Sequence, residues 1–316
     1  MRAQPWAVDG RITVQKLEVF CTVVELDGVG RAAEHLFLTQ PVVTAHLRTL
    51  GRQLGAPLFE REGRGLKLTE AGERAYRWAR EALARGAELQ RDLDGLVDGS
   101  QGSAIVAAGM AAGTYMLPPI LGRFCQEFPD AAVALEVLNP EQTEDAVRTG
   151  ACDFAVMFTP FKTSGAGFVV DQLGFEEVIV VAAADGPPLA DRVTPEALAA
   201  VRFVSSPRDH ARRTLIDATA VAAGLELGPV SIELGHPEAE KRAVREGLGV
   251  ALLPRSAVAD ELRSGQLRVI EVEGVRMMVP VYLLRLAGRQ LSSLQQALYD
   301  ELRGGLVEVL EPVADG

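Results

Sequence analysis

The sequence is poor in cysteine and lacks a long hydrophobic run. Its three cysteines, Cys21, Cys125 and Cys152, lie far apart without CxxC spacing, which indicates neither a disulfide framework nor a zinc site and predicts reduced core residues. The longest uncharged stretch, residues 99–122, contains Gln101, several glycines and a Pro-Pro pair, so we predict no transmembrane helix. We therefore expect no metal and no membrane association.

Charge is unevenly distributed along the 316 residues, a length that predicts two or three domains. The net charge is −11, but residues 1–100 carry as many basic as acidic side chains, so the acidic excess lies in the rest of the chain. Within residues 44–67, five basic side chains oppose two acidic ones, which indicates a local basic surface. Near the N-terminus, Asp9 stands where a signal peptide would need an apolar core, which favours a cytoplasmic protein.

Three helices followed by a hairpin are predicted between residues 13 and 68. Apolar periodicity predicts helices over Thr13–Leu26, Arg31–Leu36 and Thr39–Leu54, with Thr13 and Thr39 as expected caps and Gly55 as the stop. Two short strands around a glycine turn follow. This order predicts a winged helix-turn-helix, and the alternative is a helical bundle with a solvated arginine face.

The third helix carries the side chains expected to contact DNA. Gln40, Thr44 and His46 are predicted to read base edges. Thr39, Arg48 and Arg52 are predicted to bind phosphates, and Pro41 stands in the first turn of the helix. Arg64, at the tip of the hairpin, is predicted to enter a minor groove. The alternative for each arginine is a solvated surface charge.

A long helix is predicted over Thr69–Gly99. Small residues and leucines recur along it with a period of 3.5, which favours a dimerising helix. The predicted seam contains Ala75, Ala79, Ala82, Leu89, Leu93 and Leu96, with Gly86 between its two halves. The alternative is a helix that packs on its own domain.

From Ser103 onward, strands alternate with helices, which predicts a parallel sheet with helices on both faces. A second such unit begins near Phe168, so we predict two α/β lobes that resemble a periplasmic-binding-protein clamp, with a ligand between them. Helix N-termini bind anions, and three loops that precede helices or follow strands are expected to face this cleft. The predicted ligand residues are Gly113, Thr114, Asn139, Thr159, Ser205, Ser206 and His236.

Two features bear on this ligand prediction. For Thr114 and Ser206, simple helix or turn capping is the alternative. A cluster of His210, Arg208, Arg212 and Arg213 suggests an anionic effector or, equally, a solvated face.

The chain resembles the LysR-type transcriptional regulators from about Ile12 to Gly304. The head motifs that carry the resemblance are RAAEHL from Arg31, TQP from Thr39, PLFER from Pro57 and LTEAG from Leu68, and the motif EGLGVALLP from Glu246 resembles the effector-domain signature. The resemblance implies double-stranded promoter DNA and a small effector as ligands, a homodimer or homotetramer, and no cofactor. It implies a DNA-binding domain at 12–70, a linker helix at 71–99 and an effector-binding domain at 103–304, with lobe I at about 103–160 and 267–304 and lobe II at about 161–266.

The sequence departs from the family pattern in the head. The Ser or Thr that usually caps the second helix is replaced by Gly30, and an acidic residue after the third helix's leucine is replaced by Gly51. The region Ser205–His210 also differs from the usual Ser/Thr-rich loop, so we do not transfer a ligand from any one family member.

Other classes of function have weaker support. An α/β enzyme lacks support because no G-x-S-x-G elbow and no phosphate-binding glycine loop is present, and the four histidines are scattered. A ligand-binding protein that acts without DNA would require the head to be only an interaction module. A redox-responsive regulator would need an accessible thiol, whereas Cys125 and Cys152 are expected to be buried on a helix and a strand.

Overall fold

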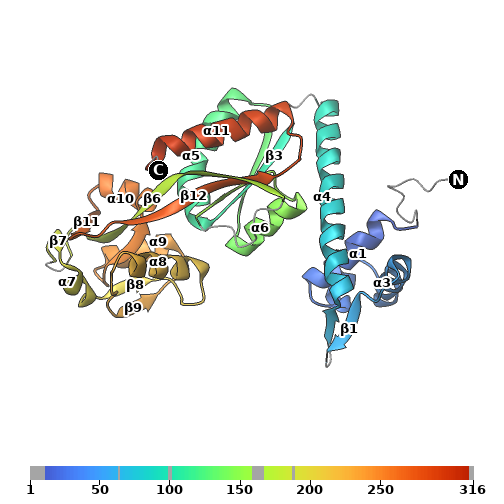
Figure 1. The fold of residues 1–316 in the computed structure, drawn as a ribbon, viewed down its shortest axis with the longest axis horizontal. Helices are drawn as coiled ribbons and strands as arrows, with labels where there is room; N and C mark the ends of the chain where they lie inside the picture. The colour runs from blue at the N-terminus through green and yellow to red at the C-terminus, as the bar shows by residue number, and fades with distance from the viewer. Residues whose placement is uncertain (1–10, 63–64, 99–101, 159–166, 187–188, 313–316) are drawn as a thin grey trace. The chain divides into compact units, whose positions relative to one another are not determined.

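A computed structural model describes residues 11–312 except 63–64, 99–101, 159–166 and 187–188 (Figure 1). The chain forms two compact units, one up to Val97 and one that begins at Asp98 and contains nearly all of the remaining chain. Among the described residues, none of the helices combines the length and the apolar character needed to cross a bilayer.

The first unit is a winged helix-turn-helix with a long following helix, as the sequence predicts. Its elements are α1 (Val14–Glu25), α2 (Val29–His35), α3 (Gln40–Leu54), β1 (Phe59–Glu62), β2 (Gly65–Leu68) and α4 (Glu70–Asp98). The two strands pair antiparallel to make the wing, with Phe59 opposite Leu68. We call α1 to β2 and the first half of α4 the head.

Aromatic contacts join three elements of the head. The Phe20 ring on α1 is fully buried and meets Phe59 of the wing edge-on at 5.6 Å and Tyr76 of α4 at 6.3 Å between ring centroids. Such edge-to-face pairs add to the free energy of burial. The head is therefore one hydrophobic core shared by α1, α3, the wing and α4.

The starts of the head helices differ from the prediction in two respects, the capping bonds of the first and third helices and the position of the second. Within the described residues, neither the Thr13 nor the Thr39 side chain makes a capping hydrogen bond, although both residues occupy the N-cap position. The second helix begins at Val29 rather than Arg31, because Asp27 adopts a left-handed backbone with φ 48° and Gly28 then becomes the N-cap. Gly30 consequently lies inside α2. The predicted stop at Gly55 is confirmed by its left-handed φ of 75°.

The second unit is built on an eight-stranded sheet in the order β4-β3-β5-β12-β6-β11-β7, with β10 also paired to β6. Only part of this sheet is parallel. Strands β3 (Ser103–Ala108), β4 (Ala132–Val137) and β5 (Phe154–Met157) pair parallel, whereas β12 (Met277–Leu286) and β6 (Phe168–Ala183) pair antiparallel. The prediction of a purely parallel sheet is wrong because the chain returns through the long strands β6 and β12.

Lobe I is formed by β3, β4, β5 and the C-terminal half of β12 with the helices η1 (Ala112–Met116), α5 (Leu117–Glu127), α6 (Pro140–Thr149) and α11 (Ser293–Val309). Its core contains Phe124 from α5, Phe154 from β5 and Leu298 from α11. The helix predicted over Thr114–Phe128 begins earlier, at Met110, and passes through the π-helical turn η1 into α5.

Lobe II follows β6 and contains β7 (Arg192–Val193), α7 (Pro195–Ala199), β8 (Phe203–Ser205), α8 (Ala211–Ala222), β9 (Val230–Glu233), α9 (Pro237–Arg245), β10 (Ala251–Pro254), η2 (Arg255–Val258), α10 (Ala259–Arg263) and β11 (Leu267–Val272). Strands β8 and β9 form a separate parallel pair. The long strands β6 and β12 run side by side from one lobe to the other (Figure 1), with an irregular register beside Val281 and Tyr282. The predicted two-lobed α/β architecture is therefore present.

Candidate DNA-binding surface and effector site

Helix α3 buries one side and exposes another. Val43, Leu47 and Leu50 are buried in the head core. Gln40, Thr44 and Arg48 follow one another at intervals of four residues, so they lie in one row along the helix. Gln40 and Arg48 are exposed and Thr44 is half-buried at the edge of the row. The structure therefore brings three of the predicted DNA contacts together on one face.

The remaining predicted DNA contacts are placed less uniformly. Exposed Arg52 continues this row, four residues after Arg48, and its guanidinium donates to Thr49 Oγ1 at 3.3 Å, whereas exposed Thr39 and Pro41 lie at the start of the helix. Because successive residues are about 100° apart round a helix, half-buried His46 lies on a different side from Thr44. Arg64, at the wing tip, lies outside the described residues.

Gly30 gives room to the first residue of α3. A Cβ on Gly30 would lie 3.3 Å from Gln40 Nε2, so the Gln40 amide reaches back over α2. A Ser or Thr at this position, as in the family pattern, would have to share this space. The departure at Gly30 thus concerns the placement of Gln40 rather than the start of α2.

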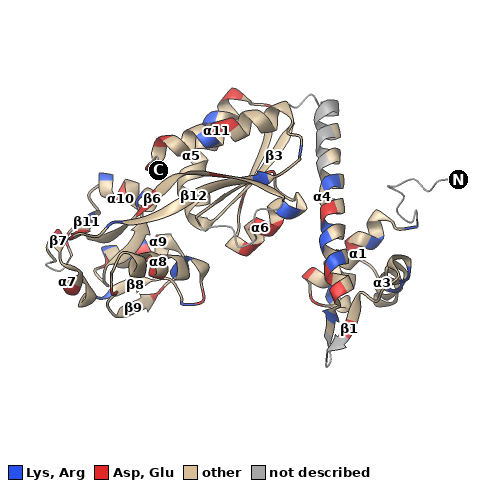
Figure 2. Cartoon of the chain, in the orientation of Figure 1, with Lys and Arg blue, Asp and Glu red and all other residues tan. Residues whose placement is uncertain are grey.

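The predicted seam of α4 divides into two parts. Ala79 is fully buried and half-buried Ala75 and Ala82 pack against the head core, so this half of the seam is used within the head. Leu89 is 58% exposed and Leu93 46% exposed, on a helix whose coloured part carries both basic and acidic side chains (Figure 2). The Leu96 side chain lies outside the described residues. The exposed leucines are therefore the part of the seam that can meet a partner helix.

Two of the predicted effector residues lie on the π-helical turn η1. Gly113 is buried, and a Cβ there would lie 2.8 Å from Val137 Cγ2, so glycine allows η1 to approach β4 closely. Thr114 is exposed, with its hydroxyl 3.8 Å from Met110 Sδ. Within the described residues Thr114 makes no capping bond, so the capping alternative does not account for it. π-Turns occur frequently at functional sites.

The other predicted effector residues have structural partners. His236 is the N-cap of α9, and its Nδ1 accepts from the Glu238 backbone N–H at 3.2 Å. Asn139 precedes α6, and its Oδ1 accepts from the Gln142 backbone N–H at 2.9 Å. Ser206 is buried and Ser205 is half-buried, while Thr159 lies outside the described residues. Both cap residues thus have a role in helix geometry that the sequence analysis did not assign.

The arginine cluster of lobe II is neutralised by carboxylates. Arg212 forms a two-pronged ion pair with Glu240, with Nη1 to Oε2 at 2.8 Å, and the Glu240 side chain is 1% exposed. Arg213 donates to Asp217 at 2.7 Å and to the Ser206 carbonyl at 3.1 Å. These pairs favour a structural role for the two arginines over direct capture of an anion. Glu240 gives no sequence signal for this, because an acidic residue on an amphipathic helix is ordinarily solvated.

Three residues missed by the sequence analysis connect the lobes. Tyr115 of η1 donates its hydroxyl to Glu238 Oε1 of α9 at 2.7 Å, and Lys241 of α9 lies 5.0 Å from the Tyr115 ring centroid. Tyr115 directly follows the predicted ligand residue Thr114, which is a weak signal because tyrosines commonly fill cores.

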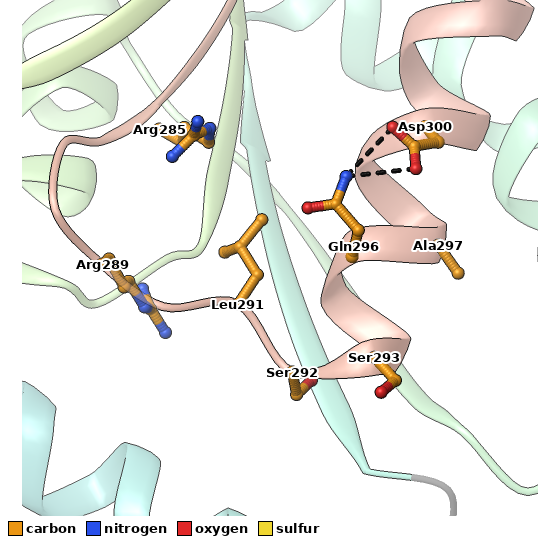
Figure 3. A pocket seen from close by; sticks show the side chains of 8 residues that line it. All are labelled: Arg285, Arg289, Leu291, Ser292, Ser293, Gln296, Ala297 and Asp300. Atoms are coloured by element: carbon orange, nitrogen blue, oxygen red, sulfur yellow. Dashed lines mark hydrogen bonds between the residues drawn. The ribbon is translucent and has the colours of Figure 1, made fainter.

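A pocket of about 660 Å³ lies in lobe I at the start of α11 and is lined by Arg285, Arg289, Leu291, Ser292, Ser293, Gln296, Ala297 and Asp300 (Figure 3). Two arginines lie on one side and Gln296 and Asp300 on the other. Arg289 is buried and pairs with Asp153, which also accepts from Gln295 at 3.2 Å. None of the described effector residues lines this pocket, and its buried arginine is committed to the lobe core.

The cysteines have different environments. Cys21 and Cys152 are buried, and burial is the main cause that raises the pKa of each thiol to about 12. Cys125 is exposed, so the prediction that it is a core residue is wrong. It follows Phe124, whose side chain fills the core of lobe I, and the turn of α5 then directs Cys125 to solvent. Cys152 precedes β5 instead of lying on a strand.

Comparison with known families agrees with this arrangement. The LysR substrate binding domain matches residues 98–306, and the bacterial regulatory helix-turn-helix protein of the lysR family matches residues 14–73. The chain belongs to the LysR family. It is therefore a LysR-type transcriptional regulator with an effector-binding domain, and not an enzyme.

Individual relatives extend over most of this LysR-family chain. A probable RuBisCO transcriptional regulator of Cyanidioschyzon merolae is 32% identical over 274 residues, which are 85% of this chain and 90% of that protein. Full-length CbnR, solved in complex with its target DNA, has a TM-score of 0.64 at 20% identity over 93% of this chain and 99% of that chain. The CcmR regulatory domain of Synechocystis PCC6803, solved with 2-PG, has a TM-score of 0.56 at 22% identity over 66% of this chain and 99% of that chain.

Proposed function

We propose that this regulator binds promoter DNA sequence-specifically through α3. The observation that carries the proposal is the row of Gln40, Thr44 and Arg48, which runs along the edge of the buried stripe of α3 with Gln40 and Arg48 exposed. Gln40 and Thr44 present amide and hydroxyl groups that suit base edges in a major groove. His46 is also proposed to reach a base edge, although it lies on a different side of α3 from Thr44. Thr39, Arg48 and Arg52 are proposed to bind phosphates and Arg64 to enter a minor groove, with Pro41 in the first turn.

Fluorescence anisotropy of the full chain with its own upstream DNA and a scrambled fragment tests this assignment. Arg48→Ala is expected to weaken binding to both fragments and to lower the slope of log affinity against log salt by about 1, because one phosphate contact is lost. Gln40→Ala is expected to reduce discrimination between the fragments by about 1–3 kcal/mol, since a base contact is lost.

Arg74→Ala is the matched control, because Arg74 is 72% exposed on α4, outside the α3 row, and pairs with Glu70. It is expected to leave both affinities unchanged. A Gln40→Ala protein that keeps the full preference for the upstream fragment would contradict base reading by α3.

We infer that a small anionic effector binds between the lobes, at Gly113, Thr114, Ser205, Ser206 and His236, with Asn139 and Thr159 at the periphery. Support comes from the exposed Thr114 hydroxyl on the π-helical turn η1 and, as a helix start, from the His236 cap of α9. Helix starts attract anions through their free N–H groups and dipole. The 2-PG complex of the CcmR regulatory domain is consistent with a small ligand in this fold.

A thermal-shift screen of small anions tests the effector proposal. A ligand that binds only the folded chain raises the melting temperature by mass action. At a ligand concentration of about a hundred times Kd, the free energy of unfolding rises by about 2.7 kcal/mol. Thr114→Ala should reduce that shift. A shift that persists in full in the Thr114→Ala chain would place the ligand elsewhere.

We also propose that the protein acts in the cytoplasm as a homodimer or homotetramer. The exposed Leu89 and Leu93 of the 71–99 linker helix support association, since two apolar side chains on an otherwise charged helix gain by mutual burial. When an effector closes the two lobes on each other, this movement would then change the spacing of the paired heads.

A further inference from the structure

The contact between Tyr115 and α9 is a network of several partners, in which Lys241 is buried, Tyr115 is half-buried and the Glu238 side chain is 46% exposed. Lys241 is 7% exposed and its ammonium group reaches Glu238 Oε1 at 2.7 Å, Glu261 Oε1 at 2.9 Å and the Ala257 carbonyl at 2.9 Å. A lysine has three N–H donors, so this ammonium group is fully satisfied. The same Glu238 oxygen accepts the Tyr115 hydroxyl. Lobe II therefore holds Glu238 through Lys241, independently of the hydrogen bond from lobe I.

The protonation states suit a lasting hydrogen bond. Burial, followed by the hydrogen bond to Glu238, raises the pKa of the Tyr115 phenol. Burial alone would raise the pKa of Glu238, but hydrogen bonds from Lys241 and Tyr115 and the nearby positive charge outweigh it and lower that pKa. At neutral pH the phenol is thus a donor and the carboxylate a charged acceptor, and charge-assisted hydrogen bonds are stronger than neutral ones.

The position of the network relates it to lobe movement. The lobes are joined covalently through β6 and β12, whose register is irregular beside Val281 and Tyr282. Tyr115 and Glu238 belong to different lobes and come from helical segments rather than from these strands. Both segments also carry predicted ligand residues, because Thr114 precedes Tyr115 and His236 caps α9.

We propose that Tyr115 and Glu238, braced by Lys241, form an interlobe latch that positions η1 and α9 relative to one another. The inference rests on the proposed effector site, which the latch would hold at a fixed opening. Neither residue need touch the ligand. Each acts as a positioning residue whose loss lets the two halves of the site move independently.

Hydrogen exchange of the full chain, measured by mass spectrometry without any ligand, tests the latch. Tyr115→Phe keeps the ring and removes the hydroxyl. It is expected to accelerate exchange about threefold to tenfold in both η1 and α9, since one net hydrogen bond changes a local equilibrium by about this factor. Peptides from both lobes must respond, although the substitution lies in lobe I.

Tyr299→Phe is the matched control. Tyr299 of α11 also donates to a carboxylate, Asp171 at 2.5 Å, but Asp171 lies on the first half of β6, paired with the half of β12 that belongs to lobe I, and neither residue contacts α9 in this bond. Its loss should leave exchange in α9 unchanged. Faster exchange in η1 alone after Tyr115→Phe would overturn the latch, because the contact would then be local to lobe I.

A double-mutant cycle distinguishes the loss of this contact from a general loss of folding. Glu238→Gln keeps the size and an acceptor oxygen but removes the charge that both Tyr115 and Lys241 use, so it should also accelerate exchange in α9. In η1 the double variant should match Tyr115→Phe alone, since there both substitutions act through the same contact. Additive effects in η1 would overturn the latch. Coupled exchange in a chain that no small anion stabilises would support the latch and contradict the effector proposal.

Discussion

At the scale of single residues, the three thiols differ in access to solvent. Cys21 and Cys152 are buried with pKa values raised to about 12, whereas Cys125 is exposed. Since the thiolate is the reactive form, we expect a thiol reagent to label only Cys125 in the native chain and all three cysteines after denaturation. Cys125→Ser should abolish native labelling. Rapid native labelling of Cys21 or Cys152 would contradict their burial.

A buried carboxyl group predicts pH-dependent stability. Glu176 is 4% exposed and accepts from the Ser256 backbone N–H at 2.8 Å, yet burial, the largest cause, raises its pKa. A pKa that is higher in the folded than in the unfolded chain favours folding below the unfolded pKa, and this contribution is lost as pH rises through the folded pKa.

We therefore expect Glu176→Gln to raise Tm at neutral pH by a few degrees, since about 1 kcal/mol corresponds to about 2–4 °C in a domain of this size. Near about pH 4, where the wild-type carboxyl is largely protonated, the gain should vanish. Thermal unfolding followed by circular dichroism at both pH values measures it. A Tm lowered equally at both pH values would show that the group's charge is not costly.

At the scale of elements, the packing of α4 on the wing depends on a glycine. A Cβ on Gly72 would lie 2.0 Å from the Leu58 carbonyl oxygen and 2.9 Å from Leu68 Cδ2. Gly72→Ala should therefore destabilise the head by about 1–3 kcal/mol or more, despite the better helix propensity of alanine. Gly86→Ala on the same helix is the control, since nothing lies within 4 Å of its Cβ. Denaturant unfolding should show it neutral or stabilised, and equal losses in both variants would contradict the steric account.

The exposed leucines of α4 predict association. Replacing Leu89 and Leu93 together with glutamate should weaken the dimer at least about a hundredfold, because burial of each leucine contributes about 1.5–3 kcal/mol. Sedimentation velocity measures the mass. Val307→Glu, at a 51% exposed position of α11, should leave it unchanged. A variant that sediments like the wild type would exclude this part of α4 from the interface.

Local chemistry explains which elements the sequence predicts well. The three head helices have apolar residues in register with a helical period, and Gly55 ends α3 in a left-handed conformation. Helix starts are harder, because the position of Asp27 in a left-handed turn decides where α2 begins. The first half of β6 is harder to predict because Asp171, Gln172 and Gly174 interrupt its apolar residues, and buried Glu176 in mid-strand has a partner, the backbone of Ser256, far along the chain.

At the scale of the whole molecule, periodicity predicts two lobes but not which residues pair between them. The crossing of β6 and β12, the pairing of Glu240 with Arg212 and the hydrogen bond between Tyr115 and Glu238 all join residues remote in sequence. No local pattern encodes such pairs. The candidate effector site was therefore predicted residue by residue, whereas its connections became visible only in the folded chain.

The central claim is that the head recognises a DNA sequence while the α/β unit senses an effector. The most direct measurement compares the affinity of the purified wild-type chain for its own upstream DNA with that for a scrambled fragment of equal length at physiological salt. We predict a preference of at least about a thousandfold, the range of specific regulators. Equal affinities for both fragments would contradict the claim.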